Sequence, residues 1–188
     1  SACQTERGLS QVRTSWAILL DYMDEWAPGA EVIQGPGQGA SFSGAQMVYP
    51  GQSEFCPAVL YVLPEGTDAL PPGGGDTVFL VCGADPAPLP GGDTVLLRCT
   101  QTPVQLCGGL AAFLRTLNEW ENSLNLAILD GCTEQDLIDR SEALLRNPVI
   151  LQDASFQYLA GTKGVTEVDE YYRQLQLGRD PTSHVVMG

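Results

Sequence analysis

The sequence predicts an α/β fold of the α+β type, in which a small mixed sheet has an amino-terminal helix and a long closing helix, followed by the start of a second domain. Three observations lead to this prediction. Apolar residues recur every three or four positions within 9–27 and 110–128, which is the spacing of an amphipathic helix. Between these stretches, short apolar runs alternate with proline–glycine turns, as strands do. After Asn147-Pro148 a strand-like run begins again.

Composition narrows the class of protein. The chain has 188 residues, 44% of them hydrophobic, which suits one ordinary domain or two small ones. Its formal net charge is -14, the wrong sign for holding phosphate backbones, so we expect no direct nucleic-acid binding. No apolar run approaches the roughly 18 residues of a membrane helix, and no signal peptide is recognisable at the start. We therefore expect a cytoplasmic protein without membrane contact.

The cysteines define neither a metal site nor a disulfide framework. Three of the six, Cys82, Cys99 and Cys107, lie in or beside apolar runs, and no C-x-x-C occurs. The only histidine is His184, so a zinc site would have no recognisable spacing. We expect free thiols that pack as small core residues, with no metal and no cofactor.

The predicted amino-terminal helix covers residues 9–27, where polar and acidic side chains take much of the face opposite the apolar stripe. Pro28-Gly29 ends it. Trp16 and Trp26 share the apolar stripe. They could fill the core or line a ligand pocket.

The glycine-rich segment 34–40 (QGPGQGA) is predicted to be a loop that opens a hairpin, with 41–49 as a strand-like stretch. Its glycines alternate with other residues, unlike the dinucleotide-binding pattern, which also needs a strand before it and a helix after it. Ser43 stands where a nucleophile elbow requires its closing glycine. The segment therefore predicts neither a dinucleotide site nor a nucleophilic serine.

Residues 58–63 (AVLYVL) form a nearly continuous apolar run suited to a central strand. The next two strands come from an imperfect internal repeat, LPPGGGDTVFLV and LPGGDTVLLR, with Asp76 and Asp93 at matching positions. Prolines at 86, 88 and 90 exclude a crossover helix between them. Neither copy has the lysine of a phosphate-binding loop, so we interpret both glycine-rich segments as turns.

Val104–Cys107 is predicted as a last short strand, and Gly108-Gly109 as the break before the long helix. This gives an amino-terminal α/β sensor-like domain over 1–109 and a long connecting helix over 110–131. Asp130-Gly131 ends the helix.

The connecting helix carries the candidate interface. Four residues of its apolar stripe make up this set: Leu117, Trp120, Leu124 and Ile128. They could pair with a second copy of the chain or pack inside their own domain, since the stripe spans fewer than three heptads.

Residues 132–188 are predicted to open the second domain. Thr133 caps a helix with Asp136 three residues on, and Asn147-Pro148 ends that helix. The elements that follow are a strand at 149–152, a turn at 153–155, a strand at 156–160, a helix at 168–177 and a strand at 183–187. Because these do not make a complete sheet, we expect a truncated domain.

The stretch 120–160 holds a set of residues typical of one kind of domain junction. They are Leu129, Leu137, Leu144, Asn147, Pro148, Asp153, Ser155 and Phe156. This set resembles the junction of PucR/CdaR-type bacterial transcriptional regulators of purine catabolism and sugar-diacid use. A second likeness, to the amino-terminal sensor region of some members, lies in Ser41–Gly44, Pro50-Gly51 and Tyr61-Val62. The resemblance implies a GAF- or PAS-like domain beginning in 132–188 and a helix-turn-helix further downstream.

We therefore expect a non-catalytic signal-input and dimerisation region of a transcription regulator, sensing a small-molecule effector and self-associating through the long helix. The resemblance implies purine derivatives or sugar acids as effectors, while no ligand-binding residue is identified. The alternative is a structural protein–protein interaction domain without a ligand. A small hydrolase-type enzyme is the third possibility, with Asp153 as the nearest catalytic candidate, although an aspartate is also common in turns.

Overall fold

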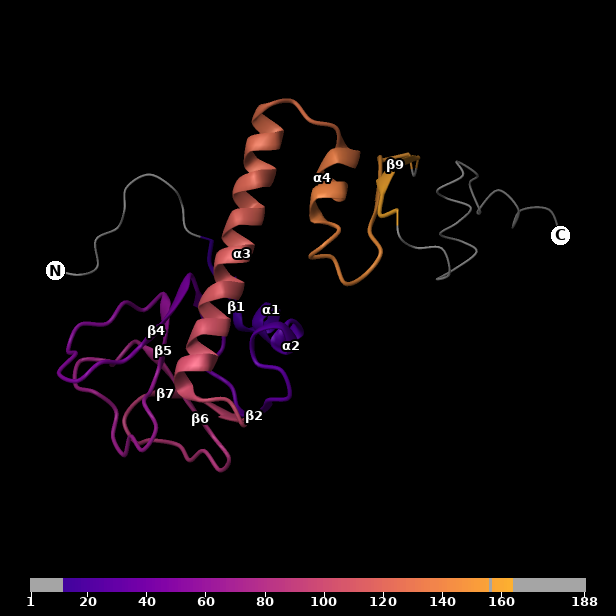
Figure 1. The fold of residues 1–188 in the computed structure, drawn as a ribbon. Helices are drawn as coiled ribbons and strands as arrows, with labels where there is room; N and C mark the ends of the chain where they lie inside the picture. Colours follow the sequence, from indigo (N-terminus) through magenta and orange to yellow (C-terminus); the bar gives the residue numbers. More distant parts are fainter. Residues whose placement is uncertain (1–11, 156, 164–188) are drawn as a thin grey trace. The chain divides into compact units, whose positions relative to one another are not determined.

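The computed structural model describes residues 12–155 and 157–163 (Figure 1). Two compact units form within the chain, unit 1 over Ser1–Glu119 and unit 2 over Trp120–Gly188. One helix, α3 (Pro103–Leu129), contributes residues to both. The division at 109 and 131 stays a prediction, and the expected helix at 168–177 and strand at 183–187 lie outside the described residues.

Unit 1 is built on a five-stranded sheet. In spatial order its strands are β2 (Glu31–Gln34), β7 (Asp93–Arg98), β6 (Val78–Gly83), β5 (Val59–Val62) and β4 (Gly44–Met47). Strands β4 to β7 are parallel neighbours in chain order, whereas β2 runs antiparallel to β7. Parallel neighbours usually need a crossover helix, but loops alone join these four. Residues 44–98 therefore wind as a β-solenoid of about four turns.

The connections of the solenoid bury one face of the sheet. This face is centred on Tyr61 and Phe79. Each of the three connections supplies one large apolar residue that packs against it: Phe55, Leu70 and Leu89. The Phe55 ring meets the rings of Tyr61 and Phe79 edge-on, at centroid distances of 5.0 and 5.3 Å. Because the loops fill this side, no helix is needed there.

Alternate residues of the same strands point to the opposite face, which is also buried. Leu60, Val62 and Leu80 are all 0% exposed. Both faces of the central strands β5 and β6 are thus largely removed from water, as expected for nearly continuous apolar strands in a parallel arrangement.

The amino-terminal part of unit 1 holds four short elements. They are β1 (Thr14–Ser15), α1 (Trp16–Asp21), α2 (Met23–Trp26) and β3 (Ser41–Phe42), with β1 and β3 paired antiparallel. The ring of Tyr22, between the two helices, lies 5.4 Å from the ring of Phe113 in α3. The Val12 N–H donates to the Asn118 side chain at 3.1 Å. These contacts join α3 to the amino-terminal segment within unit 1.

Helix α3 has a defined signal at each end. Thr102 and Gln105 form a reciprocal capping box around Pro103, since each side chain accepts a hydrogen bond from the other residue's N–H. At the other end Gly131 adopts the left-handed conformation, with a φ of 75°. The Cys132 N–H donates to Ala127 O and the Gly131 N–H to Ile128 O, the Schellman pattern.

Unit 2 contains α4 (Glu134–Ser141) and an antiparallel hairpin of β8 (Ile150–Gln152) and β9 (Tyr158–Gly161). The Gln135 amide joins them, because it donates to Gly161 O at 2.8 Å and accepts from the Gly161 N–H at 3.1 Å. A side-chain amide on α4 thus pairs with β9 as a neighbouring strand would. Asp139 adds an exposed ion pair with Lys163.

The predicted fold class, a small mixed sheet followed by the start of a GAF- or PAS-like domain, is wrong. The chain instead forms a mixed α/β structure in which a β-solenoid over 44–98 is followed by a long helix. The prediction failed because the direction of strand pairing is not visible in a single strand. Loops rich in proline and glycine suggested antiparallel turns, whereas they carry the chain back to begin a parallel strand.

Several element predictions also need correction. The predicted helix over 9–27 is, within the described residues, a short strand followed by α1 and α2. No hairpin follows the glycine-rich loop, because β3 pairs with β1 and β4 pairs in parallel with β5. Val104–Cys107 is helical, and Gly108-Gly109 lies inside α3. Helix α4 ends at Ser141, and the N–H groups of Leu144 and Leu145 both donate to Ser141 O in the turn that follows.

Other element predictions are confirmed. The run 58–63 contains the central strand β5, and both copies of the internal repeat contain strands, β6 and β7. Thr133 and Asp136 form the expected capping box of α4. The repeat motifs are offset by two residues from the strand register, since Val78 pairs with Asp93 rather than with Val95. A shift of two keeps the same residues on the same face.

Candidate ligand pocket

The loops after β4 and β5 line an open pocket of about 280 Å³ in unit 1. We call it the β4–β5 pocket. Its lining residues are Val48, Tyr49, Pro50, Gly51, Gln52, Ser53, Leu63, Pro64, Thr67, Ala69, Pro71 and Pro72. Because β4 and β5 are parallel neighbours, their carboxyl ends meet at one edge of the sheet.

The wall that follows β4 is a hydrogen-bonded turn. The Gln52 N–H donates to Tyr49 O at 3.1 Å, and Gly51 has a φ of 80°, which suits the third residue of a type II turn after Pro50. The buried Gln52 side chain accepts from the Tyr49 N–H at 3.3 Å and donates to Glu54 O at 3.2 Å. The turn therefore keeps its shape through its own side chain.

The wall that follows β5 is held in a similar way. The Thr67 hydroxyl donates to Pro64 O at 2.7 Å across a turn that contains Gly66, with a φ of 75°. Gly73, with a φ of 91°, then brings this connection against the first wall: a Cβ there would lie 2.5 Å from Ser53 O. A side chain at Gly73 would force the two walls apart.

The lining is apolar and uncharged. Four of the twelve lining residues are prolines, and Tyr49, which also lines the pocket, is 55% exposed. None of the lining residues carries a formal charge. The side-chain hydroxyls of Tyr49, Ser53 and Thr67 are polar groups of the lining, whereas the Gln52 amide already bonds within its turn.

Sequence reasoning did not find this pocket. Its residues come from two segments that only the parallel register of β4 and β5 brings together. The available signal was a pair of proline–glycine turns placed just after apolar runs, at Pro50-Gly51 and at 64–67. That signal alone marks turns and not a shared edge.

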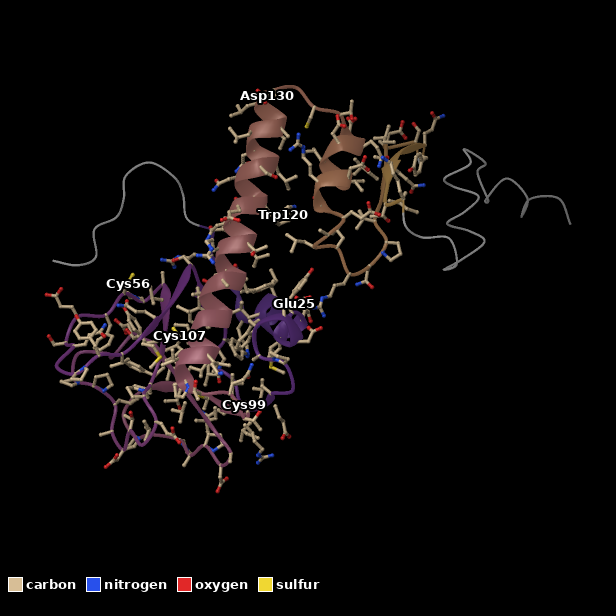
Figure 2. All side chains as sticks on the ribbon, viewed as in Figure 1. Glu25, Cys56, Cys99, Cys107, Trp120 and Asp130 are labelled. Carbon is tan, nitrogen blue, oxygen red and sulfur yellow. The ribbon has the colours of Figure 1, made fainter. Side chains whose placement is uncertain are left out.

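The structure separates the four candidate interface residues. Leu117 is 8% exposed in the core of unit 1. In unit 2 the indole of Trp120, which Figure 2 labels on α3, donates to the Ser141 hydroxyl at 3.1 Å. Leu124 is half-buried. Ile128 is 57% exposed and has Leu126 and Leu129, 63% and 82% exposed, beside it in sequence. Exposed apolar surface thus gathers in the last turns of α3.

The glycine-rich loop 34–40 is held in place by strand β7 of the solenoid. The Asp93 carboxylate in β7 accepts from the Gly37 N–H at 2.9 Å. The Gln34 amide donates to Thr94 O at 3.0 Å. Asp93, which occupies a matching position in the internal repeat, therefore fastens a loop.

The described cysteines are all free thiols, namely Cys56, Cys82, Cys99, Cys107 and Cys132. The pKa of Cys82 is raised to about 12, first by burial of the thiol and then by the neighbouring Cys99 thiol. Burial also raises the pKa of Cys107. Raised thiol pKa values oppose nucleophilic chemistry, because the thiolate is the reactive form. Figure 2 marks Cys99 and Cys107 in unit 1.

Asp153 acts as a turn residue. Its carboxylate accepts from the N–H groups of Ser155 and Gln157, at 2.8 and 2.9 Å. Among residues 12–155 and 157–163, no three histidine, cysteine or acidic side chains are placed to hold a metal ion. None of the helices in this part of the chain is long and apolar enough to span a bilayer.

The chain was compared with protein families, curated proteins and solved structures. No family model, no curated protein and no solved structure matches the chain.

Proposed function

We propose that this chain is a non-catalytic signal-input module of a cytoplasmic transcription regulator, which senses a small molecule in the β4–β5 pocket. The observation that supports sensing is a pocket whose two walls are fixed by their own hydrogen bonds and whose lining is free of charge. A preformed apolar pocket with few polar groups is the usual form of a small-molecule site. The regulator context comes from the PucR/CdaR-like residues of 120–160.

The test is thermal unfolding of the 188-residue chain against a panel of metabolites. A ligand that binds only the folded state raises Tm, by an amount that grows with its concentration. We expect a shift with at least one compound, and we expect Gly73→Val to abolish the shift by displacing the wall at Ser53. Gly75→Val is the matched control, because a Cβ there meets nothing within 4 Å. A panel without any shift in the well-folded chain would contradict sensing.

A second function, self-association through α3, is favoured by the exposed apolar residues Leu126, Ile128 and Leu129. In this proposal the last turns of α3 pair with those of a second copy, with or without a ligand. Sedimentation of the wild-type chain should show a dimer, and Ile128→Glu should shift it to monomer. The exposed control Val104→Glu, at 68% exposure near the start of the same helix, should leave the dimer intact. A monomeric wild-type chain would contradict this proposal.

A further inference from the structure

The chemistry of the β4–β5 pocket limits the kind of molecule it can hold, and this argument rests on the proposed sensing function. We propose that the pocket takes an uncharged, flat ring compound of one or two rings that carries an N–H or O–H donor. Four features of the pocket support this description: its charge, the residues of its walls, its volume and its polar groups.

The lack of positive charge in the lining argues against an anionic ligand. No lysine, arginine or histidine lines the pocket, so a carboxylate or phosphate would lose its water without gaining a cationic partner. The chain as a whole carries a net charge of -14, and Glu54, Glu65 and Asp68 lie in the same two connections. An anion would therefore enter against the field of the protein.

A cation meets a related obstacle. The acidic residues of the connections attract positive charge at a distance, yet none of them is among the lining residues. A cation inside the pocket would find no carboxylate among the lining residues to replace its hydration. An uncharged ligand has no such cost.

The walls favour a flat ring. Pro50, Pro64, Pro71 and Pro72 present rigid ring surfaces, and the Tyr49 ring is 55% exposed beside them. Aromatic ligands gain from stacking or edge contacts with a tyrosine ring beyond the area that they bury. The turns that carry Pro50 and Pro64 are already hydrogen-bonded, so ordering the walls adds little to the cost of binding.

Volume and polar groups complete the description. The pocket, at about 280 Å³, lies just below the usual range of ~300 to 1,000 Å³ for ligand sites, which suits one or two rings. The Thr67 hydroxyl uses its own hydrogen on Pro64 O, so its oxygen can only accept a further hydrogen bond. An N–H or O–H group on the ligand would donate to this oxygen.

Four probes of one size separate these features: benzamide is neutral and flat, benzoate is anionic, benzamidine is cationic, and cyclohexanecarboxamide is neutral but not flat. Saturation-transfer NMR and titration calorimetry with the full chain should show benzamide as the tightest binder. Tyr49→Ala should weaken benzamide binding about tenfold through loss of the ring contact. Tyr49→Phe keeps the ring and should bind benzamide as the wild type does.

Each result decides one claim. Benzoate or benzamidine binding as tightly as benzamide would overturn the uncharged class and leave sensing intact. Equal binding of cyclohexanecarboxamide would overturn the flat ring. Benzamide binding unchanged by Tyr49→Ala would overturn the pocket as the binding place. If none of the probes binds while the metabolite panel still raises Tm, the ligand class is wrong and sensing stands.

Discussion

Cys82 shows how burial sets the chemistry of a single residue. It lies at the end of β6, close to Cys99, and the raised pKa keeps its thiol protonated at neutral pH. Cys99 in turn donates to Gln101 O at 3.6 Å. The sequence predicted thiols that pack rather than react, from apolar neighbours alone, because burial of a cysteine follows from the run that contains it.

The raised pKa of Cys82 has a consequence for stability at alkaline pH. The pKa of this thiol is about 12 in the folded chain against an ordinary value of 9.0. The contribution of the protonated thiol to stability is therefore fully present below pH 9 and is lost as pH rises toward 12. Cys82→Ser removes the titrating group. The urea midpoint of the wild type should therefore fall more steeply between pH 9 and 11 than that of Cys82→Ser. Parallel curves would show that the fold does not hold this thiol neutral.

At the scale of elements, α3 depends on a glycine that sequence reasoning took for a helix break. An ideal Cβ at Gly109 would lie 2.5 Å from Trp26 O, whereas at Gly108 it meets nothing within 4 Å. Gly109 thus permits close approach between α3 and the end of α2, and Gly108 has no such role. The helix continues through both because Thr102, Pro103 and Gln105 start it a turn and a half earlier.

The two glycines therefore give a matched pair of substitutions. Gly109→Ala should destabilise the chain by about 1 to 3 kcal/mol, since the Trp26 carbonyl cannot move without disturbing the core. Gly108→Ala should instead stabilise it by up to about 1 kcal/mol, because alanine is the better helix former. Urea unfolding followed by circular dichroism measures both. Equal effects of the two substitutions would contradict the close contact.

At the scale of the whole molecule, strands were predictable and their assembly was not. The run 58–63 reads as a central strand because nearly every residue in it is apolar, and Leu60 and Val62 are indeed 0% exposed. Strand β2 escaped prediction because it is an outer strand of the sheet with little buried surface. The solenoid depends on Phe55, Leu70 and Leu89, which lie outside every strand.

The same limit applies to the candidate site. Each wall of the β4–β5 pocket is a turn that local residues specify, such as Pro50-Gly51. Their adjacency comes from the pairing of Gly44 with Val59 and of Met47 with Val62, a parallel register that neither segment encodes alone. Sequence reasoning therefore found the turns and missed the pocket.

If the connections build the core, an apolar residue in a loop should matter as much as one in a strand. Leu89→Ala should lower the free energy of unfolding by about 1 to 3 kcal/mol, since Leu89 packs against the Tyr61 and Phe79 face. Val104→Ala is the control, because that side chain is 68% exposed and lies outside the proposed self-association surface, so it should change stability by less than about 1 kcal/mol. Denaturant unfolding gives both values. A Leu89→Ala variant as stable as the control would show that the loop is dispensable.

The antiparallel strand β2 also affects how this architecture can change in length. It covers the free edge of β7, so a further parallel turn cannot stack beyond that end without displacing it. Each strand of the coil pairs only with its immediate neighbours along the sheet. Duplication of one internal turn would therefore lengthen the coil by a strand while the strands at its two ends keep their present partners.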